Sequence, residues 1–245
     1  MTVELPLPAL SPSGLLLLDK PSGVTSFDCV ALVRRQLGVR RVGHCGTLDP
    51  AARGLLLILI GSATKAQDSF LGYEKEYRFR AELGRKTATG DLEGEVRETK
   101  PFDHVSQDLL EKVMESFVGD IQQIPPMYSA LKYKGKPYYR YARKGQTIPL
   151  QPRTVTISSF SLLSFALPFW EARAVCSRGT YIRTLAEDVA ERLQTCGTLT
   201  DLVRERIGPY LREQAHSWDT LREVGREQLL TFLQPLSPLL ATTHA

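Results

Sequence analysis

The sequence is poor in cysteine and has no long apolar run. Its four cysteines are widely spaced and form no Cys-x-x-Cys pair, which argues against both a zinc site and a disulfide framework. No apolar run approaches the roughly 18 residues of a membrane-spanning helix, and the first 20 residues lack the features of a signal peptide. We therefore expect a folded cytoplasmic protein, whose 42% of hydrophobic residues can build a core.

Acidic residues are absent from two stretches, although the net charge of +4 is too small to indicate a polyanionic partner. One stretch, between Cys29 and Leu48, contains Arg34, Arg35, Arg40 and Arg41. The other, from Lys132 to Arg153, has seven basic residues interleaved with Tyr133, Tyr138, Tyr139 and Tyr141. Basic groups suit phosphates and aromatic rings suit unpaired bases, so this second stretch is either an RNA-binding surface or a solvated basic face with half-buried tyrosines.

The apolar pattern predicts alternating elements without internal repeats or disordered linkers. Strands are expected at 14–18, 55–61, 75–83, 153–166 and 169–176, and helices at about 26–37, 106–117, 180–193 and 219–233. Thr25 or Ser26 is expected to cap the first helix, whose apolar face would hold Phe27, Val30, Val33 and Leu37. These elements predict one α+β domain around a largely antiparallel sheet.

Between the first helix and the 55–61 strand lies the sequence GHCGTLDP, which contains Asp49. Its glycines and proline disfavour regular structure, so we predict a loop, where catalytic groups concentrate. An Asp before Pro is also a common structural device, because its carboxylate can accept bonds from backbone amides in a turn. The nearby His44 and Arg53, with glycines that permit close approach by a ligand, favour a functional role.

Five longer segments occur in one order between Gly14 and about Tyr210. They read GLLLLDKPSGVTSFD, VGHCGTLDPAARGLLLILIGSATK, EKEYRFRAELGRKTATGDLEG, QIPPMYSALKYKGKPYYRYARKG and CSRGTYIRTLAEDVAERL. The set resembles the TruB family of tRNA pseudouridine synthases. The resemblance implies the pseudouridine synthase catalytic fold, with a mixed, mainly antiparallel sheet flanked by helices. It also implies an isomerase that needs no metal or organic cofactor and converts uridine 55, in the T-arm of tRNA, to pseudouridine after flipping the base.

The resemblance assigns three catalytic residues. Asp49 matches the family's catalytic aspartate, which either attacks carbon as a nucleophile or removes a ribose proton. Tyr77 matches an active-site tyrosine that stacks on the uracil, although the period-two pattern alone would make it a core-facing strand residue. Arg183 matches an arginine that pairs with the catalytic aspartate; otherwise it would be a surface helix residue paired with Glu187.

Four further residues match positions that contact or surround the substrate. His44 would occupy the place that the flipped base vacates, and Leu202 would line the uracil pocket. Lys20 and Asp91 fall in motifs near the site, where Lys20 either contacts phosphate or supports the loop. The basic stretch from Lys132 matches the family's RNA-grasping insertion. In one departure, Val203 and Arg204 stand where two adjacent arginines are common, which weakens inference about the RNA-facing surface there.

The resemblance spans most of the chain, so we expect a single catalytic domain at 1–245 with its core at about 14–210. The C-terminal RNA-binding domain of longer relatives is expected to be absent or reduced to a remnant at 211–245. This disfavours the dyskerin-like, guide-dependent branch. The expected partner is therefore the T-arm stem-loop of tRNA, without membrane, guide RNA or obligate protein partner.

Two other classes of function fit the sequence less well. A noncatalytic RNA-binding or RNA-folding protein would not need Asp49, Tyr77 and Arg183 together. A glycoside hydrolase would usually need two suitably placed carboxylates, and a single loop acid fits it poorly.

Overall fold

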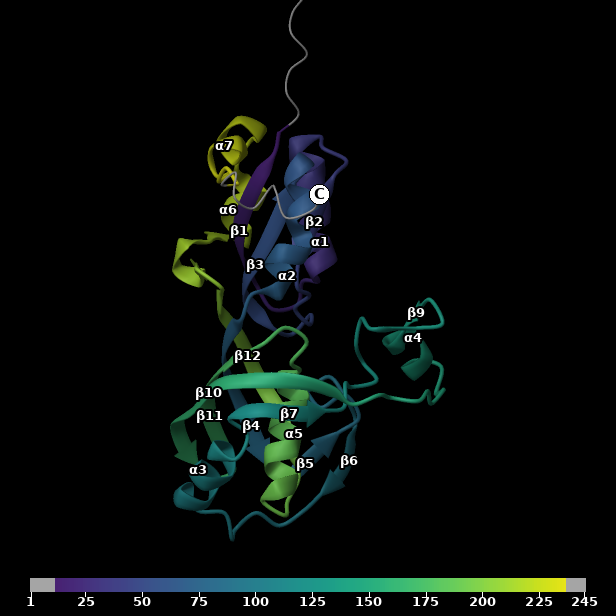
Figure 1. Cartoon of the computed structure of the whole chain (residues 1–245), viewed down its shortest axis with the longest axis vertical. Helices are drawn as coiled ribbons and strands as arrows, with labels where there is room; N and C mark the ends of the chain where they lie inside the picture. Colours follow the sequence, from purple (N-terminus) through teal and green to yellow (C-terminus); the bar gives the residue numbers. More distant parts are fainter. Residues whose placement is uncertain (1–11, 237–245) are drawn as a thin grey trace, which may run out of the picture. The chain divides into compact units, whose positions relative to one another are not determined.

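The computed structural model describes residues 12–236, which fall into two compact units (Figure 1). Unit 1 holds the described residues up to Leu71 and those from Tyr210 onward, and unit 2 holds Gly72–Pro209. Residues 237–245, the end of the expected remnant, lie outside the described residues, and the single-domain organisation stays a prediction. Among residues 12–236, no helix is both long and apolar enough to cross a membrane.

Unit 1 is built on a small sheet with two leucine-rich central strands. β1 (Gly14–Lys20) runs antiparallel to β3 (Arg53–Ile60), and β3 also pairs antiparallel with β2 (Val42–Cys45). The short β14 (His216–Ser217) adds to β1 in parallel. Nearly every residue of β1 and β3 is buried, which accounts for their continuous apolar runs and confirms both predicted strands.

Helix α1 (Ser26–Leu37) confirms the predicted cap. The Thr25 hydroxyl accepts from the Asp28 amide while the Asp28 carboxylate accepts from the Thr25 amide, and the helix ends at left-handed Gly38. The prediction that Phe27 joins the apolar face is wrong, because its side chain is 66% exposed. Ser26 takes the inward position at the start of the helix, and Phe27, about 100° further round, points to solvent.

The C-terminal part of the described chain belongs to the core of unit 1. The predicted helix at 219–233 is wrong as a single element, because it is split into α6 (Trp218–Glu223) and α7 (Arg226–Thr231) by extended Val224. Leu221 and Leu229, one from each helix, are fully buried against α1. The remaining short elements of this unit are η1 (Gly61–Ala66), α2 (Gln67–Gly72), β13 (Tyr210–Leu211) and η2 (Arg212–Gln214).

Unit 2 contains an antiparallel sheet that confirms three predicted strands. Its strands, in spatial order, are β12 (Gly197–Ile207), β4 (Lys75–Leu83), β11 (Phe169–Cys176), β10 (Arg153–Ala166) and β7 (Gly119–Gln123). Alternate residues of β4 are buried, as the period-two pattern predicts, and Phe79 packs edge-on against Trp170 at 5.3 Å between ring centroids.

Two helices and a small hairpin complete the body of unit 2. α3 (Gln107–Glu115) and α5 (Ile182–Arg192) confirm the two predicted helices, and both contact the sheet. β5 (Arg85–Thr87) and β6 (Val96–Thr99) form a hairpin beyond the end of β4.

The carboxyl of Asp188 on α5 gives unit 2 a pH-dependent stability. Burial, reinforced by Glu191, raises the pKa of Asp188 to about 6. The folded protein thus holds this proton more tightly than the unfolded chain, so the free energy of unfolding falls as pH rises from about 4 to 6. Asp188→Asn should therefore add about 1 kcal/mol at pH 7.5, after allowance for solvent screening, and little at pH 4. Urea denaturation at both pH values measures this, with Glu115→Gln, exposed on α3, as the control; equal shifts at both pH values would contradict it.

Candidate active site and RNA-binding segment

The glycine-rich motif around Asp49 is a short strand followed by a loop. The prediction of a loop is wrong for Val42–Cys45, which forms β2 because the buried β3 residues 57–60 offer it a ladder of backbone partners. His44 lies half-buried in β2, and its carbonyl accepts from Gln67 Nε2 at 3.0 Å. Asp49 lies in the loop that follows and is half-buried.

The backbone on both sides of Asp49 is fixed by the segment that opens α1. Buried Ser26 Oγ accepts from the Leu48 amide at 2.9 Å and donates to the Leu48 carbonyl at 3.1 Å. The Gly23 amide donates to the Pro50 carbonyl at 2.8 Å. The motifs DKPSGVTS and GTLDP are therefore one structural unit, in which the first holds the second in place.

Lys20 supports the same loop from inside unit 1. Its side chain is fully buried, and Nζ donates to the carbonyls of Pro21 at 2.9 Å, Val24 at 2.6 Å and Pro50 at 3.1 Å. Of the two roles considered for Lys20, these bonds favour loop support over contact with phosphate.

Removal of the Ser26 hydroxyl should loosen the loop that carries Asp49. Ser26→Ala leaves a buried amide and carbonyl of Leu48 without this partner, so we expect a loss of about 1–3 kcal/mol in the free energy of unfolding. Chemical denaturation measures the loss, and single-turnover kinetics at saturating RNA should show a lower rate constant. The control is Ser22→Ala, because Ser22 is exposed in the same segment. Wild-type stability and rate in Ser26→Ala would remove Ser26 from this role.

In unit 2, the Arg183 side chain is anchored at the start of α5. It is only 4% exposed, so the alternative of a surface arginine paired with Glu187 is wrong. Nη1 donates to the Thr89 carbonyl at 2.8 Å, Nη2 donates to the Tyr128 carbonyl at 2.7 Å, and Nε lies 3.8 Å from Asp91 Oδ2. Two segments distant in sequence, the turn at 89–91 and the backbone at Tyr128, thus fix the plane of one guanidinium.

Asp91 organises the turn that carries one of those carbonyls. Its Oδ1 accepts from Thr89 Oγ1 at 2.5 Å and from the Glu93 amide at 3.1 Å. Gly90 has a φ of 76°, and a Cβ there would lie 3.0 Å from a carboxylate oxygen of Glu187 on α5. The turn is therefore closely packed on the helix that carries Arg183. A substrate contact by Asp91 stays a prediction.

Tyr77 and Leu202 lie on the buried face of the unit 2 sheet. Tyr77 on β4 is opposite Arg204 on β12, and Leu202 is opposite Phe79, so these four residues share one face. The burial of Tyr77 matches the core-facing pattern of β4. Arg204, which stands where the family commonly has one of two adjacent arginines, has a side chain that is only 1% exposed. The sequence contained a signal for this burial, because Arg204 stands two residues after apolar Leu202 and alternate residues of a strand share one face.

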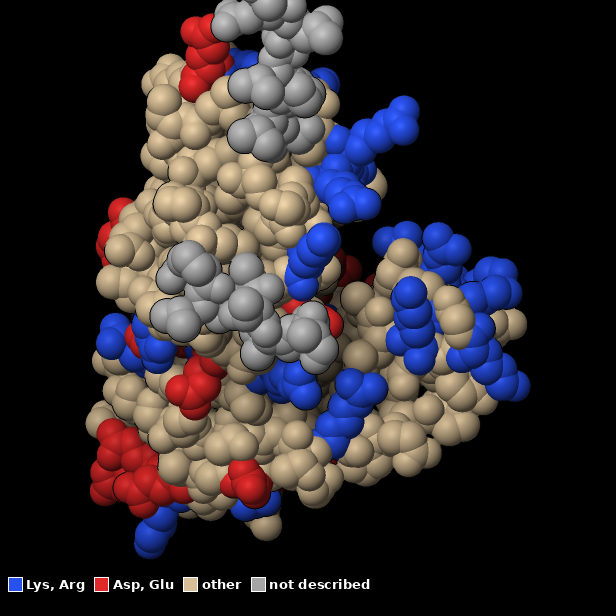
Figure 2. All heavy atoms as spheres, turned by 45° about the horizontal axis from the view of Figure 1, so that its top comes forward, with Lys and Arg blue, Asp and Glu red and all other residues tan. Residues whose placement is uncertain are grey.

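The basic, tyrosine-rich stretch forms a projecting segment of unit 2, which we call the basic arm (residues 129–150). It contains β8 (Lys132–Tyr133), β9 (Lys136–Pro137) and α4 (Tyr138–Ala142), of which the last two lie away from the sheet in Figure 1. Tyr138 and Ile148 are buried, and the Tyr141 hydroxyl donates to the Tyr133 carbonyl at 3.0 Å. Its basic side chains are exposed, at positions 132, 134, 136, 140, 143 and 144, and Figure 2 shows blue side chains gathered over this part of the molecule.

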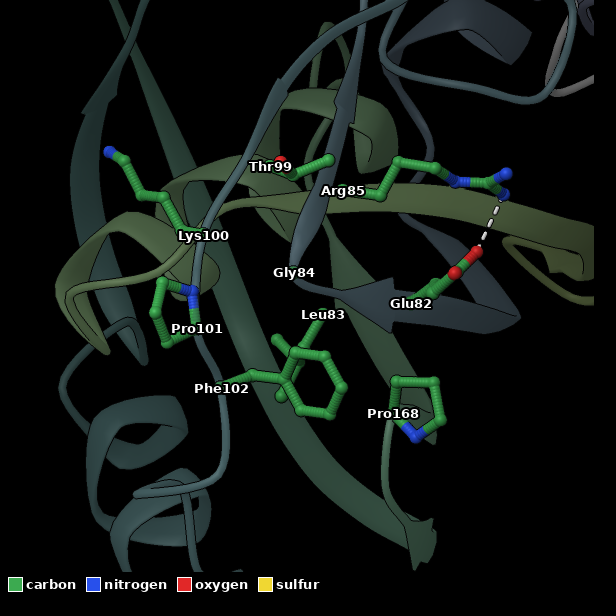
Figure 3. A pocket seen from close by; sticks show the side chains of 9 residues that line it. All are labelled: Glu82, Leu83, Gly84, Arg85, Thr99, Lys100, Pro101, Phe102 and Pro168. Atoms are coloured by element: carbon green, nitrogen blue, oxygen red, sulfur yellow. Dashed lines mark hydrogen bonds and ion pairs between the residues drawn. The ribbon is translucent and has the colours of Figure 1, made fainter.

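A pocket of about 490 Å³ lies elsewhere in unit 2 (Figure 3). It is lined by Glu82, Leu83, Gly84, Arg85, Thr99, Lys100, Pro101, Phe102 and Pro168. Two of the charged side chains that line the pocket form an ion pair with each other, because Arg85 Nη2 lies 2.6 Å from Glu82 Oε2. Leu83 is six residues from Tyr77 along β4, about 20 Å in an extended strand, and no expected site residue lines this pocket.

Comparison with known proteins identifies the family. Residues 34–182 match the family described as TruB family pseudouridylate synthase (N terminal domain). The chain belongs to this family. It is 45% identical to tRNA pseudouridine synthase B of Burkholderia lata, over 94% of the chain and 71% of that protein. It is 48% identical to tRNA pseudouridine synthase B of Endomicrobium trichonymphae, over 79% of the chain and 84% of that protein.

Solved structures support the same fold. The chain resembles a chain of a Cbf5–Nop10–Gar1 complex with a TM-score of 0.70 and 27% identity, covering 91% of this chain and 60% of the solved one. For an archaeal box H/ACA Nop10–Cbf5 complex the TM-score is 0.68 at 24% identity, over 95% and 62%. The chain thus spans about three-fifths of these neighbours. The expected α+β fold and the expected enzyme class, an RNA pseudouridine synthase, are both confirmed.

Proposed function

We propose that this member of the TruB family isomerises uridine 55 in the T-arm of tRNA to pseudouridine, with Asp49 as the catalytic group. The observation that carries the proposal is the match to tRNA pseudouridine synthase B over nearly the whole chain, with the catalytic motif GTLDP at Asp49. Tight fixation of the backbone around Asp49 supports it, because a reacting group must be held in one geometry.

The reaction needs no co-reactant, because all atoms of the product come from the substrate. The bond from ribose C1′ to uracil N1 breaks, the freed uracil turns, and C1′ joins C5, which then loses its proton while N1 gains one. Asp49 promotes the first step either by attack on carbon or by removal of a ribose proton, and both routes use an ionised carboxylate.

Residues of unit 2 are proposed to act on the same uridine. The fixed guanidinium of Arg183 would pair with the Asp49 carboxylate and fix its direction. Tyr77 would stack on the uracil and accept the C5 proton late in the reaction, and Leu202 would line the base pocket. Within unit 2, Tyr77 and Leu202 lie on one face of the sheet, which supports their contact with the same base.

The target base must leave its stack before it can react. Extrusion costs a few kcal/mol, which contacts elsewhere on the RNA must offset. We propose that the His44 ring occupies the vacated position, and that the basic arm supplies phosphate and base contacts. We also propose that recognition needs neither guide RNA nor an obligate protein partner. The tRNA substrate itself is supported by two relatives at 45% and 48% identity that are named as tRNA enzymes.

Release of tritium from unmodified tRNA labelled at uridine C5 tests the proposal directly. The label must leave as C5 becomes the glycosidic carbon, so one equivalent should be released per tRNA. A tRNA with cytidine at position 55 is the matched control and should release none from that position. Tight tRNA binding without tritium release would contradict the catalytic proposal. Equal tritium release from both RNAs would show that the enzyme modifies a uridine other than uridine 55.

A further inference from the structure

We propose that one exposed face of α1 and the turn after it bind the RNA stem that flanks the target loop. This α1 surface consists of Phe27, Ala31 and Arg35, at helical spacings of four, together with Arg40 and Arg41 beyond the helix. The inference rests on the proposed function, and it assigns a role to the acid-free stretch between Cys29 and Leu48 that the catalytic assignment does not use.

The arginines of the α1 surface are available to a ligand. Arg35, Arg40 and Arg41 are exposed, and within residues 12–236 their side chains make no hydrogen bond or ion pair. Arg34 differs, since its Nη2 donates to the Val42 carbonyl at 3.0 Å and ties α1 to β2. The three exposed guanidiniums therefore have no evident structural task, and clustered arginines without acids favour a phosphate backbone as partner.

One end of the α1 surface lies beside the loop that carries Asp49. Ser26, one residue before Phe27, holds both backbone groups of Leu48, next to Asp49. At the other end, α1 is 12 residues long, about 18 Å, so Arg40 and Arg41 lie about that far from the loop. The stem is an A-form RNA duplex, and at this distance the arginines would reach phosphates several base pairs from the target base.

Phe27 suits the end of this surface that is close to the target. An aromatic ring exposed over two-thirds of its area, beside a loop that receives an extruded base, can stack on a neighbouring unpaired base. It would contribute affinity without charge, whereas the arginines would contribute affinity that salt screens.

The test measures the affinity of an unmodified T-arm hairpin as a function of salt, using filter binding to the full chain. For Arg35→Gln/Arg40→Gln/Arg41→Gln we expect at least about tenfold weaker binding at 0.1 M salt, and a salt slope lower by about one per arginine. The lysine triple variant should restore both values, because phosphates accept a point charge. Arg222→Gln is the matched control: this arginine is also in unit 1, is 61% exposed and pairs with its helix neighbour Asp219.

Two further experiments test the stem assignment and the role of Phe27 separately. On a hairpin whose stem phosphates are methylphosphonates, the glutamine triple variant should bind as wild type does; a persisting loss would overturn the stem assignment. Phe27→Ala should weaken binding about fivefold without changing the salt slope, and wild-type affinity would remove Phe27 from the surface. Affinity within twofold and an unchanged slope in the triple variant would reject the arginines. Tritium release by the wild type, run in parallel, reports separately on the proposed catalysis.

Discussion

Asp49→Asn is expected to abolish pseudouridine formation while tRNA affinity stays within about twofold of wild type. An asparagine matches the shape of the aspartate but can neither attack carbon nor accept a proton at neutral pH, so both routes open to Asp49 are lost. The rate should fall by at least about 10⁴-fold, the size seen when other enzymes lose a central catalytic group.

Binding should survive because neighbouring residues hold the loop backbone on both sides of Asp49. Ser26 holds Leu48, while Lys20 and Gly23 hold Pro50. RNA affinity comes mainly from phosphate contacts, which this substitution leaves unchanged.

The measurement combines tritium release with filter binding to the same tRNA. Asp68→Asn, an exposed acid in the first turn of α2, serves as the control and should behave as wild type. Release by Asp49→Asn within tenfold of wild type, or a large loss of affinity, would remove Asp49 from the catalytic role.

Much of the fold could be predicted because local patterns and tertiary contacts agree. In β4 the alternation of apolar and charged residues matches a sheet with one buried face, and in α1 the capping residues and Gly38 mark both ends. The prediction of one continuous helix at 219–233 was wrong. Its apolar spacing continues through Val224 and Gly225, but the extended backbone at Val224 breaks it, and Leu221 and Leu229 are buried from two separate helices.

The site was predicted from motifs, whereas the contacts that hold it could not be. β2 forms through its partner β3, which no local rule around Gly43 reveals. Lys20 is a cation in the sequence, and only the structure shows Nζ surrounded by three backbone carbonyls. Arg183 likewise binds carbonyls from segments 94 and 55 residues away, a spacing that carries no sequence signal.

Arg183→Lys is expected to lower the rate constant for pseudouridine formation at least about a hundredfold, with little change in tRNA affinity. The guanidinium donates through Nη1 to Thr89 and through Nη2 to Tyr128, and its third nitrogen faces Asp91. A lysine has one nitrogen at the end of a flexible stem and cannot reproduce this planar arrangement. A cation that is no longer held in this plane is displaced from the reacting geometry, and a hundredfold loss of rate corresponds to about 2.7 kcal/mol of transition-state stabilisation.

The matched control is Arg192→Lys, at the last position of the same helix. Arg192 Nη1 donates to Ser116 Oγ at 3.0 Å and the guanidinium lies 4.8 Å from the Phe117 ring, so the substitution tests the same chemical change on an exposed side chain. Single-turnover rates and affinities should be measured well below the melting temperature of each variant. A slow Arg183→Lys enzyme with wild-type affinity and a folded α5 supports a catalytic role. If only its stability falls while its rate constant is unchanged, the buried guanidinium serves to anchor the turn at Asp91 and has no part in the reaction.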